Sequence, residues 1–204
     1  IVLAEDVTAA TLERMRIERE RDYDLLTGLY NRRAFYRFAG RVFDQPDKMK
    51  HAAVVMMDLD NLKRTNDTFG HEWGDRYIHE AAVCFLRSIP EETLCARVSG
   101  DEFNILFYGY DSREAVQQAI DRLISGAENS CFNLPDGTAT RIHVSGGIAW
   151  YPDDGTEMME LIKCADYAMY RIKKSKKGRF GVFDRAQYER AEKKIKDRET
   201  RQNG

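Results

Sequence analysis

The side chains best suited to chemistry are carboxylates that follow hydrophobic runs. Asp58 comes directly after the apolar run 52–57, and Asp101 lies in the Ser-Gly-Asp-Glu-Phe segment 99–103, which follows a second apolar run. Crowding two carboxylates costs free energy unless a cation offsets their charge. Mg²⁺, or Mn²⁺ in its place, binds one or two carboxylates and completes its shell with water and substrate phosphates. We therefore expect a divalent-metal site here; the alternative is that each carboxylate caps a turn.

A lysine, an asparagine and a third aspartate follow the first carboxylate closely. Lys63 comes five positions after Asp58, in a predicted turn whose backbone N–H groups, together with the ammonium charge, can bind phosphate. Asn66 and Asp75 offer an amide and a carboxylate, which match the hydrogen-bonding edge of guanine. Each has a structural alternative: Lys63 as a solvated side chain, Asn66 as a turn residue and Asp75 as the cap of the next helix.

Hydrophobic periodicity predicts the elements that must hold these residues. Strands are predicted by continuous or alternating apolar residues, over 52–57, 94–98, 103–108 and 141–151. Core helices are predicted by apolar residues at helical spacing, from Asp75, over 116–124 and over 161–172. Asn31 is placed to cap a further helix that ends at Phe43. The order strand, helix, strand, strand, helix, strand predicts an α+β fold with a ferredoxin-like sheet flanked by helices.

Composition indicates an ordinary globular domain. The 204 residues include 43% hydrophobic residues, enough for one well-buried domain with extensions. A net charge of −2 and a pI of about 6.2 give no broad basic field, so we expect a small-molecule substrate and no nucleic-acid partner. No apolar run approaches the roughly 20 residues of a membrane span. The four cysteines form no CxxC pair, which favours reduced core residues of a cytoplasmic domain.

Four ordered blocks of the chain resemble one known family. They are the Asp-Leu-Leu-Thr-Gly-Leu-Tyr-Asn-Arg-Arg stretch 24–33, the block 58–75, the segment 99–103, and the Ala-Asp-Tyr-Ala-Met-Tyr stretch 165–170 with the lysines after it. Together they resemble the GGDEF family of diguanylate cyclases, in which two domains each hold one GTP and condense the pair into cyclic di-GMP. The resemblance implies a palm-like fold of nucleotidyl cyclase type over residues 23–184.

The resemblance also implies which residues hold the metal ion and the base. Asp58 and Asp101 match the metal ligands of the family, joined by the backbone carbonyl of Leu59. Asn66 and Asp75 match the residues that read guanine.

Further matches imply the phosphate-binding and catalytic residues. Lys63 matches a phosphate ligand that stabilises charge in the transition state, and the backbone amides of Asn61 and Leu62 match its partners. Lys173 matches a second phosphate lysine, Arg179 corresponds to the arginine that follows it in the family, and Glu102 is the second acid of the signature. The implied reaction is attack of a 3′ hydroxyl on an α-phosphate with loss of pyrophosphate, which needs metal and cationic stabilisation more than covalent catalysis.

Three positions depart from the pattern of the family. Ser99 stands where the first glycine of the signature is expected. The glycine and arginine after the phosphate lysine fall two residues late, at Gly178 and Arg179. The window 90–93 reads Pro-Glu-Glu-Thr and lacks the Arg-x-x-Asp motif of the inhibitory product site, so we expect no strong product inhibition through it.

Two hypotheses follow for function. The first is an active cyclase that works as a homodimer; Ser99 lowers its activity at most and does not abolish it. The second is a GTP-binding module that has lost turnover and regulates a neighbouring domain. A cyclase with another nucleotide product is a third. Residues 1–22 resemble the end of a PAS-like sensor domain with a polar linker helix from Thr8 to Asp24, and the charged stretch 185–204 resembles an exit helix that leads to an EAL domain.

Overall fold

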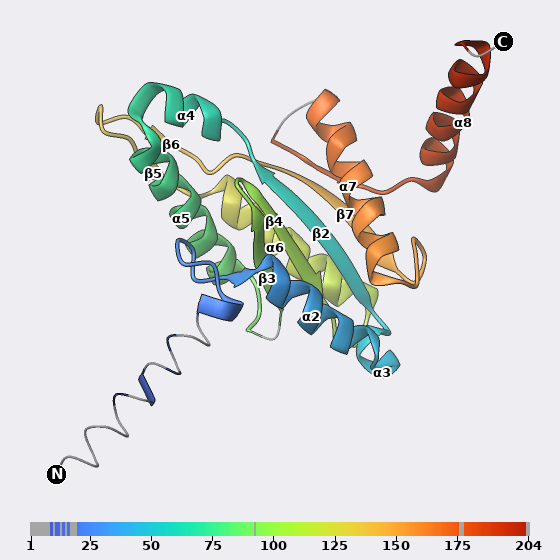
Figure 1. Cartoon of the computed structure of the whole chain (residues 1–204), viewed down its shortest axis with the longest axis horizontal. Coiled ribbons are helices and arrows are strands. Elements are labelled where there is room, and N and C mark those ends of the chain that lie inside the picture. Colours follow the sequence, from blue (N-terminus) through green and yellow to red (C-terminus); the bar gives the residue numbers. More distant parts are fainter. Residues whose placement is uncertain are drawn as a thin grey trace.

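A six-stranded mixed sheet forms the centre of the molecule, as the computed structural model in Figure 1 shows. The structure describes residues 9, 11, 12, 14, 16, 20–91, 93–175 and 178–202, with side chains as far as Lys194. The strands lie in the order β1 (Tyr30–Asn31), β3 (Leu94–Ser99), β4 (Glu102–Phe107), β2 (Ala52–Leu59), β7 (Val144–Tyr151) and β8 (Phe180–Val182). The four inner strands run antiparallel to their inner neighbours, and the two short edge strands pair in parallel.

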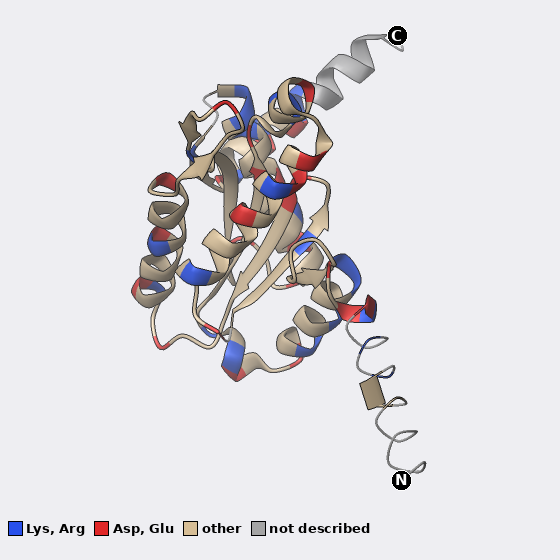
Figure 2. Ribbon diagram, turned by 90° about the vertical axis from the view of Figure 1, so that its left-hand side faces the viewer, with Lys and Arg blue, Asp and Glu red and all other residues tan. Residues whose placement is uncertain are grey.

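Helices cover both faces of this sheet. One face packs against α2 (Arg32–Phe43) and α7 (Met158–Ser175), the other against α5 (His71–Ser88) and α6 (Arg113–Glu128). Smaller elements complete the described chain: α3 (Pro46–Met49), α4 (Leu62–Phe69), the hairpin of β5 (Phe132–Asn133) and β6 (Ala139–Thr140), and α8 (Arg185–Gln202). In Figure 2 basic and acidic residues alternate along the helices, whereas the sheet is almost free of them. The predicted α+β fold, a sheet flanked by helices, is confirmed.

Strand β2 is buried along its whole length because helices cover both of its faces. Its side chains alternate between the two hydrophobic clusters: Met56 packs with α2 and α7, whereas Met57 and Leu59 pack with α5 and α6. The same alternation places Asp58 on the face that α7 covers, and Asp60 directly follows the end of the strand. Strand β2 therefore brings the carboxylate of Asp58 beneath one particular helix.

Several boundaries differ from the prediction. The segment expected to be a turn around Lys63 is the helix α4, and α5 begins at His71 rather than at Asp75. Gly70 separates the two helices with a φ of 87°, a conformation that glycine adopts without strain. The long strand begins at Val144 rather than at Arg141, because β6 ends at Thr140 and residues 141–143 connect it to β7 outside any strand. Edge strands of two or three residues are too short to produce a periodic signal.

The ends of the chain and the cysteines also bear on the predictions. The polar linker helix ends at Asp22, whereas Thr8 and the sensor-like segment 1–8 lie outside the described residues. The charged stretch after Asp184 forms α8 over Arg185–Gln202. Cys95 and Cys164 are buried as expected, but Cys131 is exposed, so the expectation of four core cysteines is wrong there. None of the described helices combines the length and hydrophobicity needed to cross a membrane.

Candidate active site

Asp58 and Asp101 meet at the end of strand β2. Within the sheet Asp58 lies opposite Glu102 of β4 on one side and Ser145 of β7 on the other. The next residue, Leu59, donates its backbone N–H to the carbonyl oxygen of Asp101 at 3.0 Å, which ties the β3–β4 turn to the end of β2. Both carboxylates line a cavity of about 510 Å³. The two predicted metal ligands are thus brought together.

Burial makes the carboxylate of Asp58 costly to ionise. Only 7% of Asp58 is exposed, and this desolvation raises the pKa of its carboxyl group, as does the nearby charge of Asp101. An ion pair with Lys173 of α7 opposes both effects and lowers the same pKa. The net shift is upward, so one ammonium group does not fully offset the burial of this charge. A divalent cation between the two carboxylates would supply the missing compensation.

The donor set fits a magnesium-like ion. Across the part of the chain that the structure describes, no group of three or more His, Cys, Asp or Glu side chains is arranged to hold a metal by itself. Mg²⁺ and Mn²⁺ do not need such a cage, because substrate phosphates and water complete their octahedral shell. Two carboxylates beside an open cavity therefore suit an ion that arrives with a phosphorylated substrate.

Other residues that line the same cavity are suited to phosphate. Helix α4 begins after Asn61, whose φ of 68° is left-handed, and no side chain caps the helix. Backbone N–H groups in an uncapped first turn remain available to an anion. Asn61, Leu62 and Lys63 all line the cavity, and Lys173 lines it from α7. The structure thus brings four of the predicted phosphate-binding positions together.

Asn66 and Asp75 also come close in space. Asn66 lies on α4 against Gly74 of α5, so close that a Cβ at Gly74 would stand 1.8 Å from the Asn66 Oδ1 atom. That oxygen is buried and accepts no hydrogen bond. A buried acceptor without a donor is costly unless a ligand satisfies it. The amide oxygen of Asn66 thus has no protein donor and lies against Gly74, the residue before Asp75.

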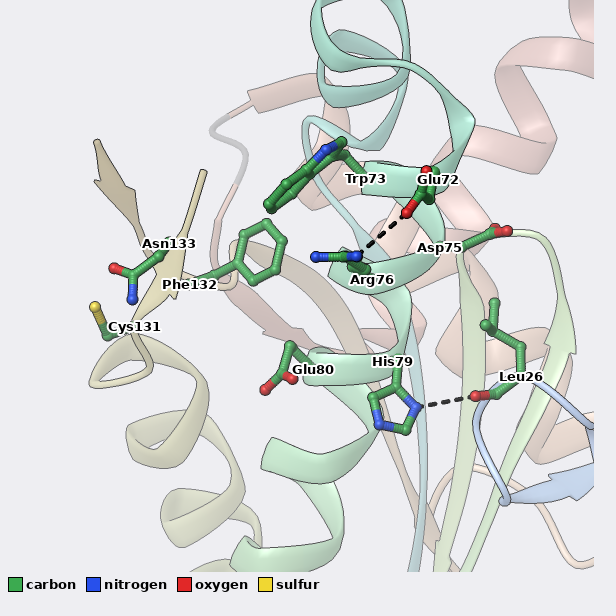
Figure 3. Close-up of a pocket in the computed structure, with 10 residues that line it drawn as sticks. All are labelled: Leu26, Glu72, Trp73, Asp75, Arg76, His79, Glu80, Cys131, Phe132 and Asn133. Carbon is green, nitrogen blue, oxygen red and sulfur yellow. Dashed lines mark hydrogen bonds and ion pairs between the residues drawn. The ribbon is translucent and has the colours of Figure 1, made fainter. Parts of the chain in front are cut away.

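Asp75 lines a second cavity of about 550 Å³ between α5 and the β5–β6 hairpin. Figure 3 shows that its carboxylate leaves α5 on the side that faces Leu26, opposite to Phe132 and Cys131. Because α5 begins at His71, the alternative role of Asp75 as a helix cap is wrong. The side chain is exposed and available to a ligand.

Three predicted site residues do not line either cavity: Asn66, Glu102 and Arg179. Glu102 begins β4 opposite Asp58 in the sheet but is not among the residues that line the cavity. Arg179 is exposed, and its backbone carbonyl accepts the N–H of Gly146 at 2.9 Å in the β7–β8 pairing. The two-residue displacement of this arginine thus leaves its backbone in an edge-strand contact.

Sequence reasoning misses Asp60 and the residues that brace the hairpin. Asp60 is 4% exposed and lines the same cavity as Asp58. Its position two residues after Asp58 in a strand was a usable signal, because alternation puts both on one face. In the β3–β4 turn, Arg97 donates to the Gly100 carbonyl at 2.9 Å and pairs with both carboxylate oxygens of Asp24 at 3.2 Å. This contact fixes the hairpin to the turn that opens the domain.

Comparison with known proteins decides the family. The family model described as “Diguanylate cyclase, GGDEF domain” matches residues 21–179. The chain belongs to the GGDEF domain family. Signaling protein YkoW from Bacillus subtilis is 33% identical over 183 residues, and cyclic di-GMP phosphodiesterase PdeR from Escherichia coli is 32% identical over 182. These alignments cover 89% and 86% of this chain but only 23% and 26% of the relatives, so the GGDEF domain spans about a quarter of their length.

Solved GGDEF structures share the fold. The GGDEF domain of TpbB (YfiN) from Pseudomonas aeruginosa superposes with a TM-score of 0.72 and 29% identity, over 79% of this chain and 94% of that one. The GGDEF domain of DgcB from Caulobacter crescentus, solved in complex with c-di-GMP, gives a TM-score of 0.69 and 25% identity, over 79% of this chain and 95% of that one.

The degenerate GGDEF signature leaves the hairpin backbone unstrained. Ser99 is exposed and lies beside a register shift between β3 and β4. Asn61 is the one non-glycine residue with a positive φ in the described part of the chain, so Ser99 adopts an ordinary backbone conformation. The serine therefore adds only a Cβ and a hydroxyl to the surface of the turn.

We expect Ser99→Gly to preserve or raise catalytic turnover, because it removes atoms near the candidate metal ligands without relieving or creating strain. Steady-state kinetics of the two proteins would measure the change, with thermal denaturation to confirm equal folding. A large fall in turnover would instead show that the hydroxyl makes a contact that the site requires.

The inhibitory motif of the family is absent from the window before β3. Thr93 is buried and donates its backbone N–H to the Pro90 carbonyl at 3.1 Å, which closes a turn. Neither position carries a guanidinium group or a carboxylate that could bind a cyclic dinucleotide.

Proposed function

We propose that this GGDEF domain is a diguanylate cyclase that condenses two GTP molecules into cyclic di-GMP and two pyrophosphates. The observation that supports it best is the cavity at the end of β2. There two carboxylates, Asp58 and Asp101, face the uncapped start of α4 and two lysines, Lys63 and Lys173. The buried, unsatisfied oxygen of Asn66 lies next to the segment that carries Asp75.

In this proposal the residues that line the cavity have two roles, metal binding and phosphate binding. Asp58, Asp101 and the carbonyl of Leu59 hold Mg²⁺ or Mn²⁺, which when bound stabilises charge on the attacking oxygen and on the α-phosphate. Lys63 and the backbone amides of Asn61 and Leu62 bind the triphosphate and offset the charge that develops as pyrophosphate leaves. Lys173 supplies a second ammonium group from α7.

The guanine base is held away from the reacting phosphate. Asp75 accepts hydrogen bonds from the N1 and N2 donors of guanine, and Asn66 contributes its amide. Adenine lacks this pair of donors, so an aspartate at this position would select against ATP.

We expect Asp75→Ala to weaken GTP binding about thirtyfold, because it removes charge-assisted hydrogen bonds, while leaving turnover of bound substrate little changed. Equilibrium titration and steady-state kinetics would separate the two effects. Glu80→Ala is the matched control, since Glu80 lies on the same helix and lines the same cavity from the side of Cys131 (Figure 3). Equal GTP affinity in wild type and Asp75→Ala would exclude the role in base recognition.

The reaction requires two copies of the domain. Each 3′ hydroxyl attacks the α-phosphate of the GTP that the other domain holds, loses its proton and displaces pyrophosphate. The segment before Asp22 is rich in charged residues and has few apolar positions, so it is a poor dimeriser by itself.

We therefore expect specific activity to rise with protein concentration, in parallel with the dimer fraction measured by analytical ultracentrifugation. A specific activity that does not depend on concentration would contradict this dimerisation argument.

The decisive experiment is incubation of the purified chain with GTP and Mg²⁺, followed by chromatography for cyclic di-GMP. Product formation supports the cyclase, and ATP in place of GTP is the control for base selection. GTP binding without product would favour the second candidate, a regulatory GTP-binding module for a neighbouring EAL-type domain. Two observations favour that candidate: Ser99 in the signature, and the similarity to PdeR, whose name is that of a phosphodiesterase.

A further inference from the structure

Asp60 is a buried acid to which the proposed reaction gives no role. It lies two residues beyond Asp58, is 4% exposed and lines the cavity at the end of β2. A carboxylate in such a place is costly unless hydrogen bonds satisfy it. The hydrogen bonds that the Asp60 carboxylate accepts therefore indicate its structural role.

The carboxylate of Asp60 joins two other elements. Its Oδ2 atom accepts the hydroxyl of Ser145 on β7 at 2.8 Å and the backbone N–H of Gly178, beyond the end of α7, at 2.9 Å. The φ of Gly178 is 75°, so a glycine is needed for the backbone conformation found there. The backbone of Asp60 is held as well, because its N–H donates to the carbonyl of His143 at 2.8 Å.

The hydrogen bond between Asp60 and Gly178 lies beyond the C-terminal end of α7, the helix that carries Lys173. Helix α7 is already pressed against β7 along its middle, where a Cβ at Gly147 would lie 2.0 Å from the carbonyl oxygen of Ala165. Lys173 lies nearer its C-terminal end, in the turn that the chain leaves at Ser175. The hydrogen bond from the Gly178 N–H to Asp60 attaches the chain after α7 to the end of β2. The same strand carries Asp58, which forms the ion pair with Lys173.

We propose that Asp60 is a positioning residue that fixes the C-terminal end of α7 and thereby places the Lys173 ammonium at the metal and phosphate site. It acts through Gly178, whose backbone N–H its Oδ2 atom accepts together with the hydroxyl of Ser145. The placement of Lys173 stands independently of the reaction, whereas its benefit to nucleotide binding rests on the proposed cyclase function.

The first test measures the placement of Lys173 without any nucleotide. Acetylation by an N-hydroxysuccinimide ester, read by mass spectrometry, is slow for an amine held in an ion pair. We expect Asp60→Ala to raise the rate at Lys173 about fivefold relative to the neighbouring Lys174 of the same molecule, and Asp60→Asn, which keeps an acceptor oxygen, to restore most of the protection. An unchanged ratio in Asp60→Ala would overturn the proposal.

Two further variants keep this test decisive. Ser145→Ala removes the hydroxyl that orients the same Oδ2 atom, and we expect it to raise the Lys173 rate about threefold; if Asp60→Ala does not fold, this variant alone decides. Asp154→Ala is the matched control, because Asp154 accepts the backbone N–H of Trp150 at 2.7 Å at the other end of β7. Equal acceleration in that control would show general loosening and overturn the proposal.

The second test asks whether Asp60 acts through Lys173. The probe is 3′-deoxyguanosine triphosphate with Mg²⁺, which lacks the attacking hydroxyl and so binds without reacting. We expect Asp60→Ala to weaken binding about tenfold in the wild-type background and hardly at all in Lys173→Met. Equal losses in both backgrounds would contradict action through Lys173. If the wild-type chain binds none of this nucleotide, the proposed function fails, and the acetylation result still decides the placement.

Discussion

Asp101→Asn is expected to lower the rate of cyclic di-GMP formation about a thousandfold, which corresponds to about 4 kcal/mol of transition-state stabilisation. The structure indicates that this substitution removes a charge without breaking the hydrogen bond that holds the turn. The turn is tied to β2 through the backbone carbonyl of Asp101, not through its side chain, so asparagine keeps the bond to Leu59 at 3.0 Å. Only the charge of the proposed metal ligand is lost.

The control for this experiment lies in the same cavity. Asp67→Asn removes an equal charge from its wall, on the exposed side of α4, and is expected to change the rate by less than about twofold, as for most surface substitutions. Initial rates at saturating GTP and Mg²⁺ for the three proteins would give the comparison. Near-normal activity of Asp101→Asn would remove Asp101 from the metal site.

Gly147→Ala should be the most damaging substitution for stability. The new Cβ would lie 2.0 Å from the carbonyl oxygen of Ala165 and 2.4 Å from the backbone nitrogen of Met169, so α7 has to move off the sheet. Because both obstacles are backbone atoms, no side-chain rotation relieves the overlap. We expect the free energy of unfolding to fall by about 3 kcal/mol or more, and the melting temperature by about 10 °C.

Gly40→Ala provides the opposite case in the same protein. A Cβ at Gly40, inside α2, meets no atom within 4 Å. Alanine there is expected to stabilise the protein by about 0.5–1 kcal/mol, because it favours the helix over the unfolded chain. Denaturant titration of both variants would check the contrast. Equal stability of Gly147→Ala and wild type would mean that α7 does not pack this closely against β7.

The main elements of the fold could be predicted because each buries a periodic set of apolar residues. The run 52–57 and the helical spacing of Ile78, Ala81, Ala82 and Phe85 were sufficient for β2 and α5. Helix α4 was missed because only Leu62 and Thr65 of its eight residues are buried, which is too few for a pattern. The start of α5 was missed for a similar reason, since its first turn, His-Glu-Trp-Gly, contains a single large apolar residue and so shows no periodic pattern.

The arrangement of the candidate site could be predicted where it depends on the type and position of side chains, and less well where it depends on backbone contacts. Asp58 and Asp101 are conspicuous as carboxylates at strand ends, and they meet as expected. The role of Asp60 depends on a hydrogen bond to Gly178, 118 positions away, which neither composition nor spacing reveals. The displacement of Arg179 was visible in the sequence, but its consequence was not, because that depends on how β8 pairs with β7.

The exposure of Cys131 has a practical consequence for optical measurements. Burial raises the pKa of Cys95 to about 12 and also raises the pKa values of Cys84 and Cys164, so these three thiols form the reactive thiolate less readily. Cys131 is exposed and lines the cavity that contains Asp75. A thiol-reactive fluorophore would therefore attach first beside the proposed base pocket, giving a reporter of nucleotide occupancy without any change to the sequence.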